Sequence, residues 1–200
     1  MKIDTEAALD ALYGTPKAPS LVKVSDHLTP EYRAWVEAAP FVALATVGPE
    51  GLDCSPRGDD GMAVTIEDAR TLVLPDRRGN DRIDSLRNVV RDPRVALMFL
   101  IPGSPTVIRV NGLGAVYAGA DDLARYAHRG AQPRSILRIT TREVYFQCAR
   151  AVMRAGLWSG RAVPENLPSP GDILAAQTDG NVGGPQYDAD WPERAAKTMW

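Results

Sequence analysis

Arginine is concentrated in one stretch of this sequence, between Arg70 and Arg94. The stretch holds seven arginines and four aspartates, whereas the whole chain of 200 residues has a formal net charge of -2. A local positive excess in a weakly acidic chain indicates a binding site for an anion rather than a general attraction to nucleic acid or membrane. Arginine suits phosphate in particular, because its planar guanidinium donates two parallel hydrogen bonds to phosphate oxygens.

The densest part of this stretch is a turn over 75–82, which precedes a helical pattern. The spacing of Ile83, Leu86 and Val90 predicts an amphipathic helix over 82–91 with one apolar face. The free backbone N–H groups at the start of a helix also donate to phosphate oxygens. The turn and the helix start together are therefore predicted to form a phosphate site.

Polar residues mark the expected start of this helix. Asn80 is predicted to cap the free N–H groups of the first turn, and Asp81 and Asp84 favour the positive end of the helix dipole. Gly79 gives the backbone freedom to turn just before them. A simpler interpretation is a solvated basic loop whose aspartates pair with its arginines, since charge runs are common on protein surfaces.

A further arginine, Arg57, ends a strand-like segment in the sequence Ser55-Pro56-Arg57-Gly58-Asp59. Alone this is a weak signal, because an arginine at the end of a strand is usually just exposed. The order of segments is more informative. A strand, a turn and the strand that ends at Arg57 precede two more strands and then the arginine-rich turn, so Arg57 is a second candidate for the same anion.

Short apolar segments dominate the first three quarters of the chain. They predict a helix after Thr29, from Pro30 to Ala39, and a longest strand over 106–119 that bends at its glycines. Many short strands with few helices between them favour an antiparallel β-barrel over a doubly wound sheet. We therefore predict a mainly β fold with a few short helices. The expected strands cover 41–47, 52–57, 62–66, 71–75, 95–101, 106–119 and 136–148.

Length and composition fit a single domain. The chain is 44% hydrophobic, enough for a core, which we expect over about residues 28–160. A C-terminal arm is expected over about residues 161–200. The arm is rich in Pro, Gly and Asp, yet it keeps apolar residues that favour an ordered segment over a linker. These residues are Ile173, Leu174, Tyr187, Trp191 and Trp200.

Several function classes are disfavoured by the sequence. No apolar run approaches the roughly 20 residues that cross a bilayer, and the acidic start is unlike a signal peptide, so we expect a cytoplasmic protein. Cys54 and Cys148 are expected to be reduced thiols, with Cys148 a small buried residue rather than a redox group. His27 and His128 have no metal-ligand spacing, so no metal site is expected.

Three segments resemble a known family, the pyridoxamine 5′-phosphate oxidase-like FMN-binding split barrels. They read ALATVGPEGLDCSPRGD, TLVLPDRRGNDRIDSLRNVVRDPRVALMFLIPG and VYFQCARAVMRAGLW, and together they span about residues 30–160. Arg82 stands at the phosphate-binding lysine of the family pattern, a change that keeps the charge and gains a bidentate fork of donors. Within the family, the chain is most similar to a bacterial subgroup with an S-P-R-G-D strand end.

The resemblance implies an FMN site shared by two subunits of a homodimer. Arg57, Arg82 and either Arg77 or Arg78 would hold the FMN phosphate. The ribityl chain and one edge of the ring would be lined by Gly58, Asp59, Leu74, Pro75, Gly79 and Asn80. The partner subunit would contribute residues equivalent to Arg109, Gln147, Arg154 and Trp158. An equal alternative for Arg109 is a cross-strand ion pair. An equal alternative for Trp158 is a position in the core or at an interface.

The resemblance also implies an FMN-dependent oxidoreductase that acts on a small substrate. The substrate and the catalytic residues are left open, and the family's C-terminal Arg-Leu-His element is replaced here by GLWSGRAVPENLPSP, which disfavours pyridoxamine phosphate itself. The alternatives are a flavin-binding sensor without turnover, a split barrel that uses haem or a deazaflavin, and a barrel that binds single-stranded nucleic acid. The last is disfavoured, because aromatic residues are only 6% of the chain and are not interleaved with the arginines.

Overall fold

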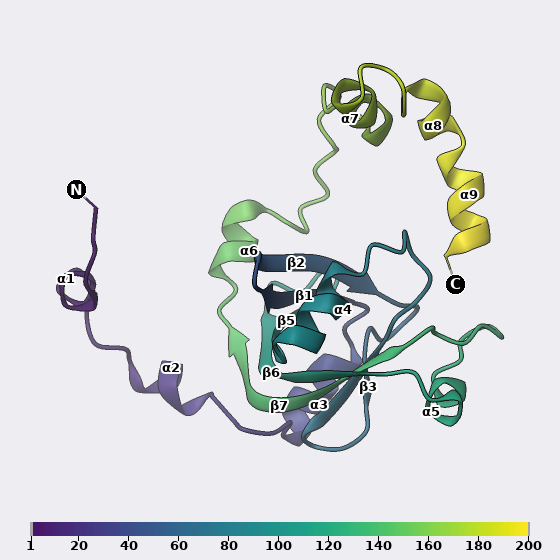
Figure 1. Cartoon of the computed structure of the whole chain (residues 1–200). Helices are drawn as coiled ribbons and strands as arrows, with labels where there is room; N and C mark the ends of the chain where they lie inside the picture. Colours follow the sequence, from purple (N-terminus) through teal and green to yellow (C-terminus); the bar gives the residue numbers. More distant parts are fainter. Residues whose placement is uncertain (1, 200) are drawn as a thin grey trace.

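The strands of the computed structural model, which describes residues 2–199, form one antiparallel sheet (Figure 1). Their order is β2-β1-β5-β6-β7-β4-β3. All paired strands within this sheet are antiparallel, which confirms the mainly β class. The strands are β1 (Phe41–Gly48), β2 (Gly51–Gly58), β3 (Thr65–Ile66), β4 (Thr71–Pro75), β5 (Arg94–Leu100), β6 (Val107–Tyr117) and β7 (Ile136–Gln147).

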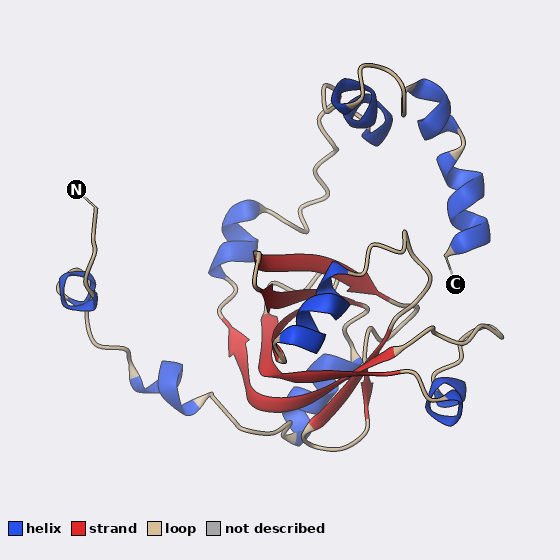
Figure 2. Ribbon diagram, viewed as in Figure 1, coloured by secondary structure: helices blue, strands red, loops and turns tan. Residues whose placement is uncertain are grey.

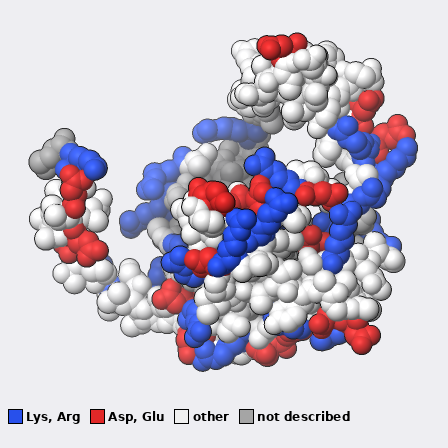
Figure 3. Space-filling model, viewed as in Figure 1, with Lys and Arg blue, Asp and Glu red and all other residues white. Residues whose placement is uncertain are grey.

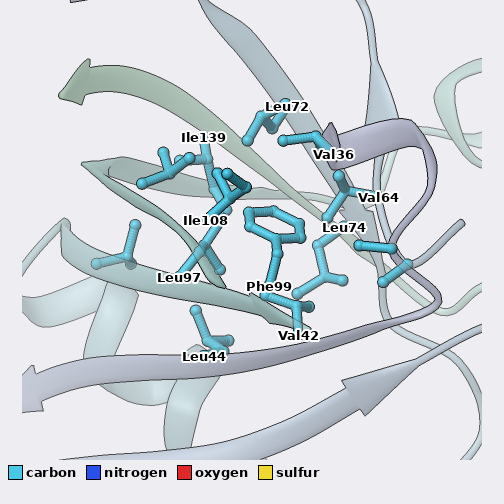
Figure 4. Close-up of a cluster of buried hydrophobic side chains, with 14 of the residues drawn as sticks. Val36, Val42, Leu44, Val64, Leu72, Leu74, Leu97, Phe99, Ile108 and Ile139 are labelled. Atoms are coloured by element: carbon cyan, nitrogen blue, oxygen red, sulfur yellow. The ribbon is translucent and has the colours of Figure 1, made fainter. Parts of the chain in front are cut away.

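The sheet curls around a core of buried aliphatic side chains. In β1, Val42 and Leu44 are fully buried while the residues between them are partly exposed, as the two-residue period of a strand requires. The Phe99 ring lies among these side chains and those of the neighbouring strands (Figure 4). The sheet has β2 at one edge and β3 at the other.

Two strands depart from the sequence prediction or refine it. β3 begins only at Thr65, because the preceding segment packs into the core and Ala63 donates its N–H to the carbonyl of Ala39 rather than to a strand. β6 bends as expected, with a register shift between Asn111 and Gly112. A side chain at position 112 would come within 2.5 Å of the carbonyl oxygen of Thr140, so only glycine fits there.

Helix α3 (Pro30–Glu37) confirms the first predicted helix. Thr29 is its N-cap and accepts a hydrogen bond from the Tyr32 N–H, and Val36 is fully buried under the barrel. Apart from α4, which is described next, the other short helices outside the arm are α1 (Glu6–Asp10), α2 (Ala18–Val22), α5 (Ala120–Arg125) and α6 (Arg150–Ala155).

Helix α4 (Asp84–Arg91) differs from the prediction in its start. It begins two residues later than expected, because Asp81 has a left-handed backbone with φ of 59° and the N-cap residue Ile83, with φ of -96° and ψ of 31°, also lies outside helical geometry. Asn80 does not cap the helix. Its side-chain oxygen instead accepts from the N–H of Arg82, and so closes a turn before the helix.

The apolar face predicted for α4 is also wrong. Ile83 and Val90 are exposed, and the buried side chains are Ser85, Asn88 and Val89. Polar contacts hold this helix to the barrel, since the Asn88 amide donates to the Thr46 hydroxyl at 3.1 Å. The spacing of apolar residues could not reveal this buried face. A polar residue such as Asn88 is expected to be exposed unless its hydrogen-bond partner is known.

The C-terminal arm consists of helices α7 (Pro170–Gln177), α8 (Pro185–Ala189) and α9 (Trp191–Thr198). Figure 2 shows these helices, and α1 and α2 at the other end, leading away from the barrel. A capping box between Ser169 and Asp172 starts α7, and α7 packs on α8. Among the expected arm residues, Trp200 lies outside the described part of the chain. Within 2–199, no helix has the length and apolar character of a bilayer span.

Candidate anion-binding site

A cavity of about 710 Å³ lies where edge strand β2 approaches the end of β4. Its other walls are the loop over 76–83, the start of α4 and the segment before β7. Ten predicted site residues line it, so the structure brings together Arg57, Gly58, Asp59, Leu74, Pro75, Arg77, Arg78, Gly79, Asn80 and Arg82.

Three side chains of β2 point into this cavity because they alternate along the strand. Asp53, Ser55 and Arg57 are partly buried, while the residues between them are exposed on the opposite face. Arg57 donates to the Ser55 hydroxyl at 2.7 Å and to the hydroxyl of Ser85 in α4 at 3.3 Å. Ser85 in turn donates to Asp53 at 2.6 Å. This network fixes the Arg57 guanidinium at the cavity wall.

Arg77 is bound differently from the other arginines of the loop. Its Nε donates to the Asp59 carboxylate at 2.7 Å, and its Nη1 donates to the carbonyl of Tyr126 at 2.7 Å. These contacts join the loop to β2 and to the end of α5. Arg77 is therefore a brace of the cavity wall. Since its guanidinium is already occupied, Arg78 is the better candidate of the two to bind a ligand.

The remaining arginines at the cavity are exposed. Arg82 pairs with Asp84 at 2.6 Å, and Arg134, which precedes β7, pairs with Asp81 at 2.7 Å. Arg78 makes no hydrogen bond or ion pair within residues 2–199. Figure 3 shows basic and acidic side chains side by side over this region of the molecule. The aspartates thus pair with the arginines, as the simpler interpretation of the loop expected, and they do so around a cavity.

Asp76 is the one carboxyl at this cavity with a raised pKa. Burial is the main cause, and the negative charge of Asp81 adds to it, while Arg57 and Arg134 act in the opposite direction. Its backbone N–H is held by the carbonyl of Ser135 at 2.9 Å, but its carboxyl oxygens accept no hydrogen bond from the described residues. The structure therefore presents an unpaired acceptor to any ligand in the cavity.

Sequence reasoning missed several polar residues of this site, Asp53 and Ser135 among them. Asp76 was counted only as a charge that offsets its arginine neighbours. Ser55 was quoted only as part of the strand end that carries Arg57, and Ser85 was assigned to a helix whose buried face was misplaced. Arg134 lies more than 50 positions from the loop that it meets, and nothing local in the sequence indicates that contact.

The four residues expected from the partner subunit do not line the cavity of their own chain. Arg109 stacks near the Tyr145 ring, 5.2 Å from its centre, and Gln147 ends β7 opposite the start of β6. Trp158 donates its indole N–H to the carbonyl of Ser104 at 2.7 Å. With Arg154 in α6, they lie near one end of the β6–β7 pair. Their role in a shared site stays a prediction.

Both cysteines are free, as expected, but Cys148 is exposed rather than buried. It follows the last residue of β7, where the chain turns into α6. The backbone N–H of Arg150 lowers the pKa of its thiol. No group of three or more potential metal ligands occurs among residues 2–199.

Comparison with known proteins identifies the family. The sequence pattern that describes pyridoxamine 5′-phosphate oxidases matches residues 28–148, more than half of the chain. The chain belongs to the pyridoxamine 5′-phosphate oxidase family. The matched region contains the whole cavity and every strand of the sheet, and it ends before the C-terminal arm. No curated protein matches the chain.

Solved structures show the same fold at low sequence identity. A pyridoxamine 5′-phosphate oxidase-like protein of Lactobacillus delbrueckii aligns over 60% of this chain and 95% of its own, with 23% identity and a TM-score of 0.50. A variant of HupZ from Group A Streptococcus aligns over 60% of this chain and 99% of its own, with 16% identity and a TM-score of 0.50. Both likenesses cover the barrel and support the split-barrel fold of the family.

Proposed function

We propose that this chain binds FMN in the cavity between β2 and β4 and works as an FMN-dependent oxidoreductase on a small substrate. The observation that carries the proposal is the donor set at one cavity. Arg57, Arg82 and Arg78 surround the start of α4, where free backbone N–H groups also lie. Such a set fits a phosphate dianion, because every member donates hydrogen bonds and the three arginines are cationic.

The rest of the cavity fits the remainder of a flavin nucleotide. Its volume lies within the roughly 300–1,000 Å³ that is usual for ligand sites. Ala63, Leu74 and Pro75 supply an apolar wall, and the Asp76 carboxyl supplies an acceptor for ribityl hydroxyl groups. Bound flavin would supply the electron transfer, and the chain would orient it and set the charge around it.

The proposal includes a homodimer, and the outward face of the sheet supports it. Ala43 of β1, Met98 of β5 and Arg109 of β6 lie in one row across the strands, and Ala45 and Ala96 lie in the next. Small side chains leave this face flat, and Met98 is exposed. A second copy packed on it would bury these residues, and we propose that its Arg109 then reaches the cavity.

The test is the cofactor itself. Protein purified from cells should absorb near the two visible bands of oxidised flavin, and mass spectrometry of the released compound should identify FMN. A colourless protein that takes up no added FMN would refute the proposal. Release of haem or of a deazaflavin would keep the cavity as a cofactor site but replace the cofactor.

Turnover needs its own measurement. The FMN-loaded protein should be reduced by a nicotinamide dinucleotide under anaerobic conditions and reoxidised by a suitable acceptor, followed by the loss and return of the visible flavin bands. A flavin that no donor reduces would favour a binding or sensing role over an oxidoreductase.

A further inference from the structure

Arg134 is the cavity residue that no sequence pattern indicated, and its place is unusual. It lines the main cavity and also a second one of about 200 Å³, together with Arg77 and Arg78. The second cavity adjoins the first, with which it shares these three arginines, and Gln132 and Pro133 also line it. Arg134 therefore stands at the junction of the two cavities.

An ion pair joins the two sides of this junction. The Nη1 atom of Arg134 lies 2.7 Å from an Asp81 carboxylate oxygen, although the residues are 53 positions apart. One partner belongs to the loop over 76–83 and the other to the segment that enters β7. Asp81 has the left-handed backbone described above.

This exposed ion pair contributes little to the stability of the fold, so Arg134 can give up Asp81 for a ligand. The side chains of Arg134 and Asp81 are 69% and 66% exposed, so water screens their attraction. Arg77 and Asp59, at the same cavity, are 18% and 7% exposed and are committed to each other. A phosphate or carboxylate group that enters the cavity offers Arg134 a doubly accepting partner in a less hydrated place.

We infer that Arg134 is an anion-binding residue of this site and that Asp81 occupies its guanidinium until a ligand takes over. The inference rests on the proposed cofactor site. The ligand group is an anionic oxygen group, from either of two sources: the phosphate of the cofactor, or the phosphate or carboxylate of a substrate bound against it in the second cavity. Asp81 acts as an internal competitor, so the two residues have opposite effects on affinity.

The experiment measures flavin binding to full-length apoprotein. Quenching of flavin fluorescence gives the dissociation constants of FMN and of riboflavin, which lacks the phosphate. The FMN-loaded protein is then titrated with inorganic phosphate, followed by the change in its flavin spectrum. The variants are Arg134→Ala, Arg134→Lys and Asp81→Asn, because asparagine tolerates the left-handed backbone. Arg94→Ala and Asp92→Asn are the controls, since they remove another arginine–aspartate pair, at the start of β5 and outside both cavities, in which Arg94 is 70% and Asp92 28% exposed.

We expect Arg134→Ala to weaken anion binding about ten- to hundredfold, the effect of losing charge-assisted hydrogen bonds. Arg134→Lys should recover part of this loss. Asp81→Asn should strengthen binding about two- to fivefold, which a damaged fold would not do. If the loss appears for FMN and not for riboflavin, the ligand group is the cofactor phosphate. If it appears only for inorganic phosphate on the loaded protein, the group belongs to the substrate.

Three results would count against the inference, and they can be told apart. Wild-type protein that binds neither FMN nor phosphate overturns the proposed function and the inference with it. Wild-type protein that binds FMN, while the Arg134 and Asp81 variants bind FMN and phosphate as it does, overturns the inference alone. Equal losses in the Arg94 and Asp92 controls would show a general charge effect and would also overturn it.

Discussion

The Nε atom of Arg77 lies 2.7 Å from a carboxylate oxygen of Asp59, and both side chains are largely buried. Asp59 follows the end of β2 and Arg77 follows the end of β4, so this pair ties together the two strands between which the cavity lies. The second hydrogen bond of Arg77, to the Tyr126 carbonyl, adds α5 to the same brace. The shape of the cavity thus depends on an arginine that is not available to a ligand.

Arg77→Ala should lower the free energy of unfolding by about 3–5 kcal/mol, because it leaves the Asp59 carboxylate buried without its partner. Arg82→Ala, at an exposed pair in the same loop, should change stability by no more than about 0.5 kcal/mol. Urea denaturation of the apoproteins measures both values. Equal effects of the two substitutions would contradict the distinction between a brace and a ligand contact.

Arg57→Ala should weaken FMN binding about ten- to hundredfold, since charge-assisted hydrogen bonds contribute about 1.5–3 kcal/mol. Titration of apoprotein with FMN, followed by fluorescence, gives the constant. Arg33→Ala on α3 is the control, because that arginine pairs with Glu37 far from the cavity. An unchanged affinity in Arg57→Ala would mean that the phosphate lies elsewhere.

Asp76→Asn should stabilise the apoprotein at neutral pH. Burial raises the pKa of Asp76, so between its ordinary value of about 3.9 and the raised value the folded protein holds a proton that the unfolded chain has lost. Stability therefore falls as pH rises through this window, and the burial penalty is complete above it. Asparagine carries no charge, so the variant does not have the free-energy cost of burying a carboxylate.

The melting temperatures of wild type and Asp76→Asn, measured from pH 3.5 to 8, should diverge as pH rises and meet at the acidic end. Asp10→Asn, on the exposed helix α1, should follow the wild type throughout. A difference between wild type and Asp76→Asn that is constant with pH would point to a packing effect instead of a charge effect.

Ala96→Glu should convert the proposed dimer into a monomer, because it places a charge at the centre of the flat sheet face. Its affinity for FMN should fall as well, if the partner completes the site. Gel filtration with light scattering measures the mass, and Val90→Glu on the exposed side of α4 is the control. A monomeric wild type that binds FMN normally would refute the shared site.

The sequence predicted the sheet well because strand burial follows a simple period. Val42 and Leu44 alternate with the partly exposed Ala43 and Ala45, and such alternation is visible without any tertiary information. The arginine-rich turn was visible as a candidate site because its charge is a local property of the chain. It lines the cavity, and its phosphate-binding role stays a prediction. The family resemblance rested on the same local segments, and it correctly indicated the split barrel.

The errors arose where contacts between distant segments decide the structure. The burial of Asn88 depends on the hydroxyl of Thr46, and the placement of Arg134 depends on Asp81. Neither contact produces a periodic pattern of apolar residues that could be recognised in the sequence. The start of α4 was misplaced for a related reason, since the backbone at Asp81 follows from the geometry of the loop and not from a cap signal.

The division between core and cavity has a consequence for how this protein can change over evolutionary time. Most residues that fill the barrel, such as Leu44 and Phe99, do not line the cavity, although Ala63 and Leu74 do, and most cavity residues lie on loops and on one edge strand. Mutations in those loops can therefore alter what is bound while the barrel remains folded. The Arg77–Asp59 brace is the exception, and a lineage that changes its ligand is expected to retain that pair.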